Sequence, residues 1–389
     1  MEQQHDGDAA KGTGLLSRIE RALGTGTAAY LPGNGWIRLT LPLDDGGPAP
    51  VTVDVIADTV RAPQGIVYLL PGGGLNFAAE FFTPGGPGRS NLAHALRRRG
   101  LLVVGVTPRE DAATAADITA EWGLAAHRRD LAGVVGALDS VLGLPYTYAG
   151  HSAGAVLALD AASYDTCPRL RRVVALDTTG PYTGDLAVRA AATRDAYATQ
   201  LAQGVTTVDP GLAAVVAKAV ADPDGVSPVP WPPDPSRRFT HAGLAHYALL
   251  RTAALPGPAN WIYVQGHGAG SYAFGPTPAE DRFAPAHTPP AVWYAATSAL
   301  GSGLVPTALM RDLAAVWAGD GELYSIAWDR IRAEVAWVNA ELGRGDRPRG
   351  AELIRAAGNE RVSFSVVPGY GHGDVVWGAG AAADVWSRF

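Results

Sequence analysis

Uninterrupted apolar runs of five or six residues recur along this chain, each followed by a stretch with helical spacing. Residues 66–70 and 101–106 are two such runs, and runs of this kind are typical of strands that are covered on both faces. Residues 91–100 predict a helix between them that ends at a glycine cap. A strand, a crossover helix and a second strand form a βαβ unit, so this part of the chain predicts a parallel pair of strands.

The same alternation continues on both sides of this unit. Two half-buried antiparallel strands with a turn between them are expected before it, because apolar and polar residues alternate there with a period of two. The further elements that we expect are strands over 36–41 and 51–56 with a turn at 44–48, a helix over 121–142, a strand over 146–149, a helix from Ser152 and a strand over 172–176.

The alternation of strand and helix patterns stops after residue 180 and resumes near residue 331. The last expected elements are strands over 334–338 and 362–367 and helices over 350–357 and 381–386. The predicted fold class is therefore α/β, with a mostly parallel, twisted sheet, helices on both faces and one large insertion after the sixth strand. The expected parts are an N-terminal arm over 1–34, a core over 35–180, the insertion over 181–330 and the rest of the core over 331–389.

Composition and charge exclude several other classes of protein. The 48 glycines and 29 prolines among 389 residues argue against coiled coils and helical repeats, and 47% hydrophobic against 17% charged residues argues against disorder. A net charge of −6 disfavours a nucleic-acid partner, and no apolar run is long enough to span a membrane. The acidic, polar start at residues 1–6 is unlike a secretory signal, so we expect a cytoplasmic protein.

A Gly-x-Ser-x-Gly pentapeptide occupies residues 150–154, with Ser152 at its centre. A nucleophile on a tight strand-to-helix turn needs very small neighbours, because a Cβ two positions away would collide with the turn. An apolar strand is expected before the pentapeptide and an Ala- and Leu-rich helix after it, and the start of a helix favours negative charge. We therefore predict that Ser152 is a catalytic nucleophile.

A run of three glycines, residues 72–74, follows the predicted strand over 66–70. Acyl transfer needs backbone N–H groups that stabilise an oxyanion, and glycines let the backbone approach a substrate closely. An ordinary glycine turn and a nucleotide-binding loop are the alternatives, but the Gly-Lys-Ser/Thr ending of the latter is missing. We expect Gly73 and Gly74, together with Ala153, to donate to the oxyanion.

His372 lies in the glycine-rich segment 368–374, directly after the last predicted strand. The carboxyl end of that strand is where a general base has to lie to reach Ser152 across the sheet. His94 and His127 fall on predicted scaffold helices, and we interpret His151, inside the pentapeptide, as a packing residue. The sequence therefore predicts His372 as the general base.

These motifs together resemble those of the α/β-hydrolase superfamily, with residues 35–180 and 330–389 as the hydrolase core. The resemblance implies an α/β-hydrolase fold, a lid or cap formed by the insertion, and the order nucleophile, acid, histidine along the chain. The segment 372–378 is also similar to the acid-lipase branch, in which the catalytic histidine is followed by Asp two residues later and then by an apolar-Trp-Gly stretch.

The acid of the expected triad has more than one candidate. In the superfamily it usually follows the penultimate strand, and segments 261–266, 291–298 and 334–338 compete for that strand. Glu341 is preferred, since the distance to His372 leaves room for one helix and one strand. Asp346 is a poorer second choice in the same loop. Asp177, at the end of the sixth predicted strand, is the alternative candidate for the triad acid.

The predicted function is that of a serine hydrolase that cleaves a carboxylic ester, lactone or thioester through an acyl-enzyme. It needs no metal and no organic cofactor. The aromatic residues of the insertion suggest a bulky, hydrophobic small-molecule substrate, although they could equally form the insertion's own core. An acyltransferase or offloading cyclase with the same triad is one alternative, and a non-catalytic ligand-binding protein of the same fold is another. The oligomeric state stays open.

Overall fold

The computed structural model describes residues 14–24, 29–33, 35–43, 47, 49–83 and 91–389. Much of the predicted N-terminal arm, including residues 1–6, and most of the predicted turn at 44–48 lie outside the described residues. Residues 14–23 form a helix whose Leu16, Ile19 and Leu23 are buried against the main core. This part of the predicted arm therefore packs on the rest of the molecule.

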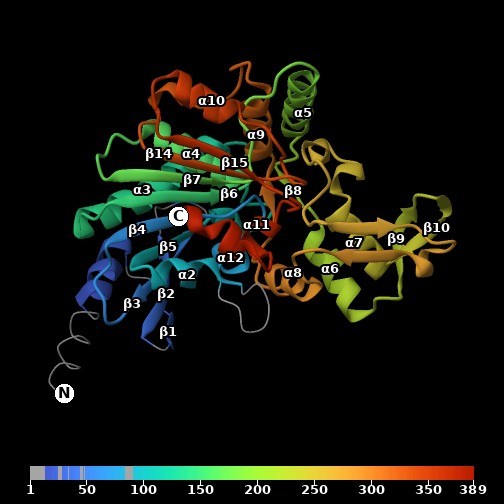
Figure 1. The fold of residues 1–389 in the computed structure, drawn as a ribbon, viewed down its shortest axis with the longest axis horizontal. Helices are drawn as coiled ribbons and strands as arrows, with labels where there is room; N and C mark the ends of the chain where they lie inside the picture. Colours follow the sequence, from blue (N-terminus) through green and yellow to red (C-terminus); the bar gives the residue numbers. More distant parts are fainter. Residues whose placement is uncertain (1–13, 25–28, 34, 44–46, 48, 84–90) are drawn as a thin grey trace.

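A nine-stranded sheet runs through the molecule in the order β1-β2-β3-β5-β4-β6-β7-β14-β15 (Figure 1). Its first four strands pair antiparallel, and from β5 onward every pair is parallel. The strands are β1 (Ala29–Gly33), β2 (Trp36–Leu43), β3 (Val51–Asp58), β4 (Gly65–Leu70), β5 (Leu101–Thr107), β6 (Tyr146–His151), β7 (Leu170–Leu176), β14 (Glu334–Ala340) and β15 (Val362–Val367).

Helices cover both faces of this sheet, because its central strands carry apolar side chains on both faces, as in β4. Its Ile66, Tyr68 and Leu70 join one core, whereas Val67 and Leu69 join a second core on the other face. The first core includes α3 (Leu124–Leu142), α4 (Ala153–Tyr164) and α10 (Arg349–Ala356). The second includes α2 (Leu92–Arg98), α11 (Asp374–Trp377) and α12 (Ala381–Asp384). The predicted α/β class, with a mostly parallel sheet between two helical layers, is confirmed.

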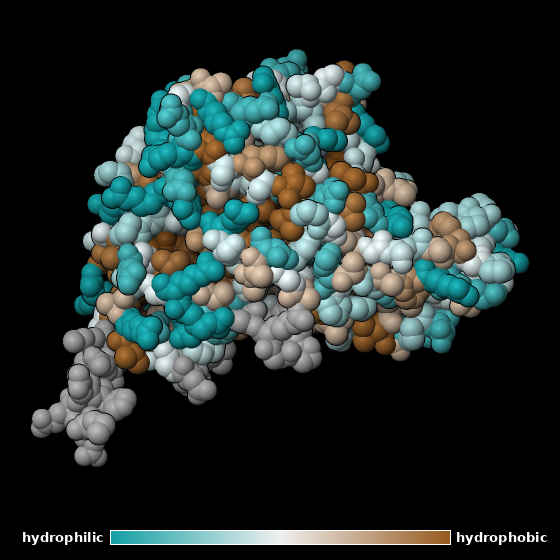
Figure 2. Space-filling model, viewed as in Figure 1, coloured by the Kyte–Doolittle hydropathy of each residue, from teal (hydrophilic) through white to brown (hydrophobic). Residues whose placement is uncertain are grey.

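Within the chain between β7 and β14, residues 212–250 lie to the right in Figure 1 and project from the main body in Figure 2. Helices α5 and α9 of the same part of the chain pack against each other. The elements between β7 and β14 are α5 (Asp185–Ala202), β8 (Thr207–Val208), α6 (Leu212–Ala221), β9 (Val226–Trp231), β10 (Asp234–Thr240), α7 (His241–Leu250), β11 (Gly270–Ala273), β12 (Arg282–Pro285), α8 (Pro290–Thr297), β13 (Val305–Pro306) and α9 (Thr307–Ala318).

Short helical turns of three to five residues complete the described chain. They are η1 (Ala78–Phe82), η2 (Arg109–Ala112), η3 (Thr252–Ala254), η4 (Asn260–Ile262), η5 (Pro278–Glu280), η6 (Trp328–Arg330) and η7 (Trp386–Arg388). Two of the three segments that competed for the penultimate strand are not strands. Residues 291–298 fall almost entirely in α8, and residues 261–266 begin in η4 and continue as bends. The strand over 334–338 is confirmed as part of β14.

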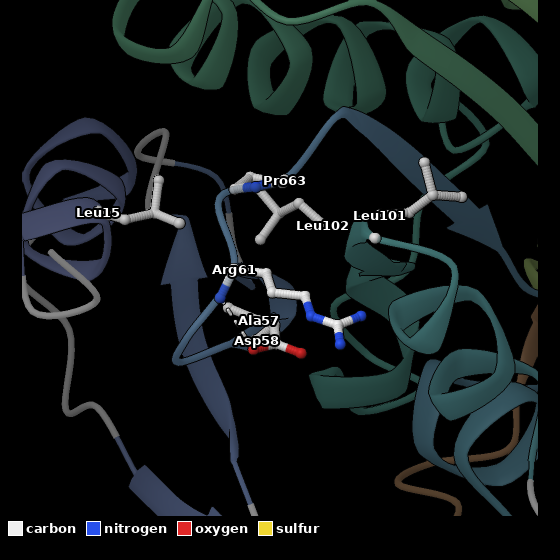
Figure 3. Close-up of a pocket in the computed structure, with 8 residues that line it drawn as sticks. Leu15, Ala57, Asp58, Arg61, Pro63, Leu101 and Leu102 are labelled. Carbon is white, nitrogen blue, oxygen red and sulfur yellow. Dashed lines mark hydrogen bonds between the residues drawn. The ribbon is translucent and has the colours of Figure 1, made fainter. Parts of the chain in front are cut away.

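A small pocket lies between the N-terminal helix, the end of β3, the loop that follows it and the start of β5 (Figure 3). Leu15, Ala57, Pro63 and Leu102 contribute its apolar wall. None of its lining residues belongs to the candidate site, so this pocket is part of the scaffold. In the part of the chain that the structure describes, no helix combines the length and the hydropathy needed to cross a membrane.

A buried ion pair joins α3 to the turn after β5. The Nε2 atom of His127 lies 3.0 Å from a Glu110 carboxylate oxygen, and Nδ1 donates to the carbonyl oxygen of Gly123 at 2.8 Å. Burial opposes the charged imidazole, but Glu110 and this carbonyl group outweigh burial and raise the pKa of His127 to about 9. The folded protein therefore holds a proton that an unfolded histidine releases near pH 6.5.

We expect the stability of the protein to fall between pH 6.5 and about pH 9 because of this pair. The stabilisation is fully present below pH 6.5 and is lost as the pH rises through the folded-state pKa, with a size on the order of 3 kcal/mol. Urea unfolding at pH 6 and pH 9.5 measures it. His127→Gln should flatten this dependence, and an equal pH dependence in the variant would contradict the assignment.

Candidate active site

The Gly-x-Ser-x-Gly pentapeptide forms the turn from β6 into α4. A Cβ built on Gly150 would lie 2.0 Å from the carbonyl oxygen of Gly154, and one built on Gly154 would lie 2.0 Å from the carbonyl oxygen of Leu70. Both contacts are far too short for any side chain. The two glycines are therefore required by the close approach of α4 to the ends of β4 and β6, which leaves Ser152 half-buried at the tip of the turn.

Backbone strain is concentrated at two residues of this region. Ser152 has φ 56° and ψ −120°, and Asp177 has φ 42°; among the described residues they are the two non-glycine residues with positive φ. Such conformations cost free energy and are found where surrounding structure enforces them, often at functional sites. The two residues are also linked, because the N–H of Ser152 donates to the carbonyl oxygen of Leu176, directly before Asp177.

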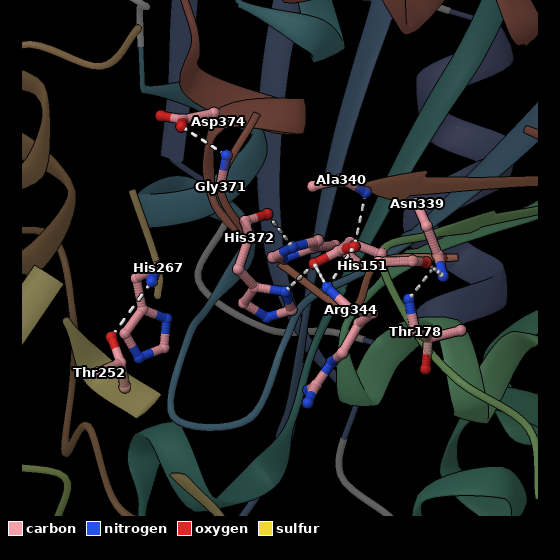
Figure 4. A network of polar contacts seen from close by, with 12 residues as sticks. His151, Thr178, Thr252, His267, Asn339, Ala340, Arg344, Gly371, His372 and Asp374 are labelled. Carbon is pink, nitrogen blue, oxygen red and sulfur yellow. Dashed lines mark hydrogen bonds and ion pairs between the residues drawn. The ribbon is translucent and has the colours of Figure 1, made fainter. Parts of the chain in front are cut away.

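The Asp177 carboxylate contacts Nδ1 of His372, and both side chains are buried. The same carboxylate accepts the backbone N–H of Ala340 at 2.7 Å and that of Arg344 at 3.1 Å (Figure 4). A Cβ on Gly343 would lie 2.2 Å from an Asp177 oxygen, so glycine is needed there to admit the carboxylate. The end of β7 and the turn after β14 thus fix the acid that faces His372.

Glu341 occupies a different position. Its carboxylate is exposed and accepts the backbone N–H of Gly369 at 2.7 Å. Asp346 is also exposed. The structure therefore brings Asp177, and not the preferred Glu341, to the imidazole of His372. The reason is the sheet order: β7 lies beside both β6 and β14, so its end is adjacent to the Ser152 turn.

The glycine loop after β4 lies beside Ser152 and Ala153. A Cβ on Gly72 would lie 3.3 Å from the Cβ of Ser152, and one on Gly73 would lie 3.8 Å from the Cβ of Ala153. Gly74 has φ +75° and packs against Gly303 instead. Within the described part of the chain, the N–H groups of Gly73, Gly74 and Ala153 donate to no protein acceptor, so they are free to bind a ligand atom.

A buried ion pair between Glu80 and His151 links this loop to His372, and the sequence did not suggest it. One Glu80 oxygen contacts Nδ1 of His151, and the other accepts the N–H of Gly72 at 2.7 Å. Nε2 of His151 donates to the carbonyl oxygen of His372 at 2.9 Å, and the two imidazole rings lie 4.4 Å apart. His151 is therefore more than the packing residue predicted for it. The available signal was a single carboxylate within the apolar segment 77–82.

Asp374 holds the loop that carries His372. Its carboxylate accepts the N–H groups of Gly371 at 2.8 Å and Ala269 at 2.7 Å, and the hydroxyl of Thr288 at 2.5 Å. This residue, which the sequence places two positions after the histidine, is fully buried. It ties the loop after β15 to two segments of the chain between β7 and β14.

Charges around His372 favour its neutral form. Burial, followed by the positive charges of His151 and Arg344 and by His267, lowers the pKa of His372 well below its ordinary value. Burial raises the pKa of Asp177 to about 6, against the opposing effects of Arg344 and the N–H donors. At neutral pH the carboxylate is ionised and accepts Nδ1–H, so Nε2 carries a lone pair that can take a proton.

Among the described residues, no group of three or more His, Cys, Asp or Glu side chains is arranged to hold a metal ion. The site has a serine on a strained turn, an imidazole with a free nitrogen and a paired carboxylate, which are groups of acid–base and nucleophilic chemistry.

No protein-family model matches the sequence, and no curated protein matches it. Solved structures do match. A proposed lipase from Sulfolobus solfataricus superposes with a TM-score of 0.60 at 16% identity, over 93% of this chain and 95% of that one. An esterase from Thermogutta terrifontis matches with a TM-score of 0.41 at 12% identity, over 87% of this chain and 92% of that one. The strand order, the strained serine turn and the likeness to the first of these structures show that this chain has the α/β-hydrolase fold.

Proposed function

We propose that this protein is a serine hydrolase that cleaves a carboxylic ester, lactone or thioester through an acyl-enzyme. His372 takes the proton of Ser152, whose oxygen attacks the carbonyl carbon of the substrate. Asp177 orients the imidazole and stabilises the imidazolium that forms. His372 then protonates the leaving group, and water, activated by the same imidazole, resolves the acyl-enzyme and restores the serine.

The observation that carries this proposal is that two strained residues lie at neighbouring strand ends and that one of them contacts a histidine. Ser152 and Asp177 both hold positive φ values, they lie at the ends of the neighbouring strands β6 and β7, and Asp177 contacts His372. Strained residues of this kind cluster at active sites and ligand-binding sites, which supports a catalytic role for both positions. The N–H groups of Gly73 and Ala153 flank the serine and would donate to the oxyanion, with Gly74 as a further candidate.

We further propose that residues 181–330 form the cap. Five aromatic residues of this segment form a core of their own: Trp231, Tyr247, Tyr272 and Phe274 pack on one another around Phe239. Tyr263 and Trp293 are different. Tyr263 contacts His372 and His267, and Trp293 contacts His267. The expectation of a hydrophobic substrate therefore depends on these two rings.

Labelling with a fluorophosphonate, followed by peptide mapping, tests the proposal without knowledge of the substrate. We expect one modified residue, Ser152, because only a serine activated by a general base reacts readily with this probe. Ser152→Ala should not be labelled, and phenylmethylsulfonyl fluoride should compete. Absence of labelling in a folded protein, or labelling at another serine, would overturn the nucleophile assignment.

A further inference from the structure

Arg344 is a buried cation that the proposed reaction does not use. The residue is 4% exposed, and its Nε and Nη1 atoms are enclosed without a hydrogen-bond partner. In Figure 4 no dashed line reaches the guanidinium group of Arg344. A buried charge without a partner is costly, because nothing replaces the water that it has lost.

Aromatic faces supply part of this lost solvation. The guanidinium carbon lies 4.7 Å from the ring centre of Tyr263 and 5.6 Å from that of Trp317. Stacking satisfies the faces of the planar group and leaves its N–H edges free. Among the described residues no carboxylate oxygen lies within 4 Å of the guanidinium group. The Asp177 carboxylate accepts the backbone N–H of Arg344 at 3.1 Å and is paired with His372.

The surroundings connect this cation to the proposed catalytic base. Tyr263, which stacks on the Arg344 guanidinium, also lies edge to face with His372 at 5.1 Å and with His267 at 4.8 Å. Tyr263 and His267 are half-buried, and among the described residues neither side chain makes a hydrogen bond. Burial raises the pKa of Tyr263, so it stays a phenol; burial and Arg344 lower the pKa of His267 to about 3, so it is neutral.

We propose that Arg344, assisted by the Tyr263 hydroxyl and the His267 imidazole, binds a carboxylate group of the substrate. The substrate is then an ester, lactone or thioester that carries a second, ionised carboxylate within reach of Arg344 while its reactive carbonyl group lies at Ser152. This inference rests on the proposed function and deepens it, since it names the substrate class of the same site.

The charge balance favours a carboxylate over a phosphate. The other cation beside His372 is His151, and Glu80 already neutralises it. One guanidinium group with two neutral donors matches a monoanion and its two oxygens. A dianionic phosphate would leave one negative charge uncompensated in a buried place, which is unfavourable.

Two esters that differ by one negative charge and one methyl group test the inference. They are the mono-p-nitrophenyl ester of glutaric acid and its methyl ester, which release the same chromophore. We expect the wild type to prefer the charged ester in kcat/KM. Arg344→Met should lower this preference roughly 10- to 100-fold, the size expected for lost hydrogen bonds to a charged group, and Arg344→Lys should lower it less. Arg189→Met, which removes an exposed arginine stacked on Trp261, is the matched control for net charge.

The ratio of the two esters separates this inference from a purely electrostatic role. If Arg344 only stabilises the Asp177 carboxylate, both esters lose rate equally and the preference is unchanged, which would overturn the subsite. Calorimetric binding of the same two esters to Ser152→Ala, with and without Arg344→Met, gives a readout that needs no turnover. If the charged ester binds only when Arg344 is present but the wild type does not hydrolyse it, the carboxylate subsite is supported and the hydrolase function is refuted. If the wild type hydrolyses both esters equally well, the hydrolase function is supported and the carboxylate subsite is refuted.

Discussion

Asp177→Asn is expected to lower kcat for an activated ester about 10⁴-fold while the protein remains folded, as loss of the acid does in a Ser–His–acid triad. The asparagine side chain is nearly isosteric with aspartate, so the buried space between β7 and β14 stays filled. The expected loss has one cause, a change in the ring nitrogen of His372 that carries the proton. The backbone N–H groups around residue 177 determine which nitrogen that is.

Two N–H donors fix the orientation of an asparagine at this position. The N–H of Ala340 donates to Oδ1 of Asp177 at 2.7 Å, and the N–H of Arg344 lies 3.1 Å from Oδ1 and 3.2 Å from Oδ2. An amide can satisfy them only with its carbonyl oxygen, which turns its NH₂ group toward Nδ1 of His372. That nitrogen must then accept, so the proton moves to Nε2, and His372 can no longer take the proton of Ser152.

Glu341→Gln is the matched control for this experiment. Its side chain is exposed, and a glutamine oxygen can still accept the N–H of Gly369, so kcat should change by no more than roughly a factor of two. Turnover of p-nitrophenyl butyrate and the melting temperatures of both variants are measured together. A large loss in Glu341→Gln with normal turnover in Asp177→Asn would restore Glu341 as the acid.

The core elements of the fold could be predicted because their signals are local. An uninterrupted apolar run such as 101–106 has to be covered on both faces, and the structure places it as β5 inside the sheet. Residues 291–298 were a candidate for the penultimate strand but form most of α8. A short apolar run with aromatic residues fits a strand and a buried helix equally well, so the local signal was ambiguous there. The prolines at 289 and 290 were the better signal, since proline at the first helical position favours α8.

The signal for the Ser152 turn was local as well, whereas no local signal brought Asp177 and His372 together. Gly150 and Gly154 are required by contacts within and beside one turn, which a pentapeptide reveals. Asp177 reaches His372 only because β7 pairs with β14 and because Gly343, far along the chain, leaves space for its carboxylate. Spacing along the sequence favoured Glu341, but a distance along the chain says little about which strand ends are neighbours in the sheet.

Glu80→Gln is expected to lower kcat about 10²- to 10³-fold, the range for loss of one oxyanion donor. Glu80 accepts from Gly72 with one oxygen and from His151 with the other. A glutamine satisfies one of them and turns its NH₂ group toward the second. Either Gly72, in the glycine loop beside Ser152, or His151, which donates to the His372 carbonyl oxygen, then loses its hydrogen bond to residue 80.

The pH profile of kcat/KM shows whether the Glu80–His151 pair acts through charge. Burial opposes the imidazolium of His151, but Glu80 raises its pKa, and the resulting cation in turn helps to lower the pKa of His372. Without Glu80, His151 becomes neutral, and the pKa of His372 rises. Asp177, Arg344, His267 and Tyr263 still face the ring, so the acid limb of the profile should move to higher pH without disappearing.

Thr288→Val is the control for a loosened His372 loop, because it removes a hydrogen bond to Asp374 without removing a charge. This variant should lower kcat and leave the acid limb in place. His151→Gln, which also removes the cation, should move the limb in the same direction as Glu80→Gln. The His151 and His372 rings lie 4.4 Å apart, so a change in the charge of His151 has to change the pKa of His372. If the acid limb stays at the same pH in both Glu80→Gln and His151→Gln, the Glu80–His151 pair only holds the two loops in place.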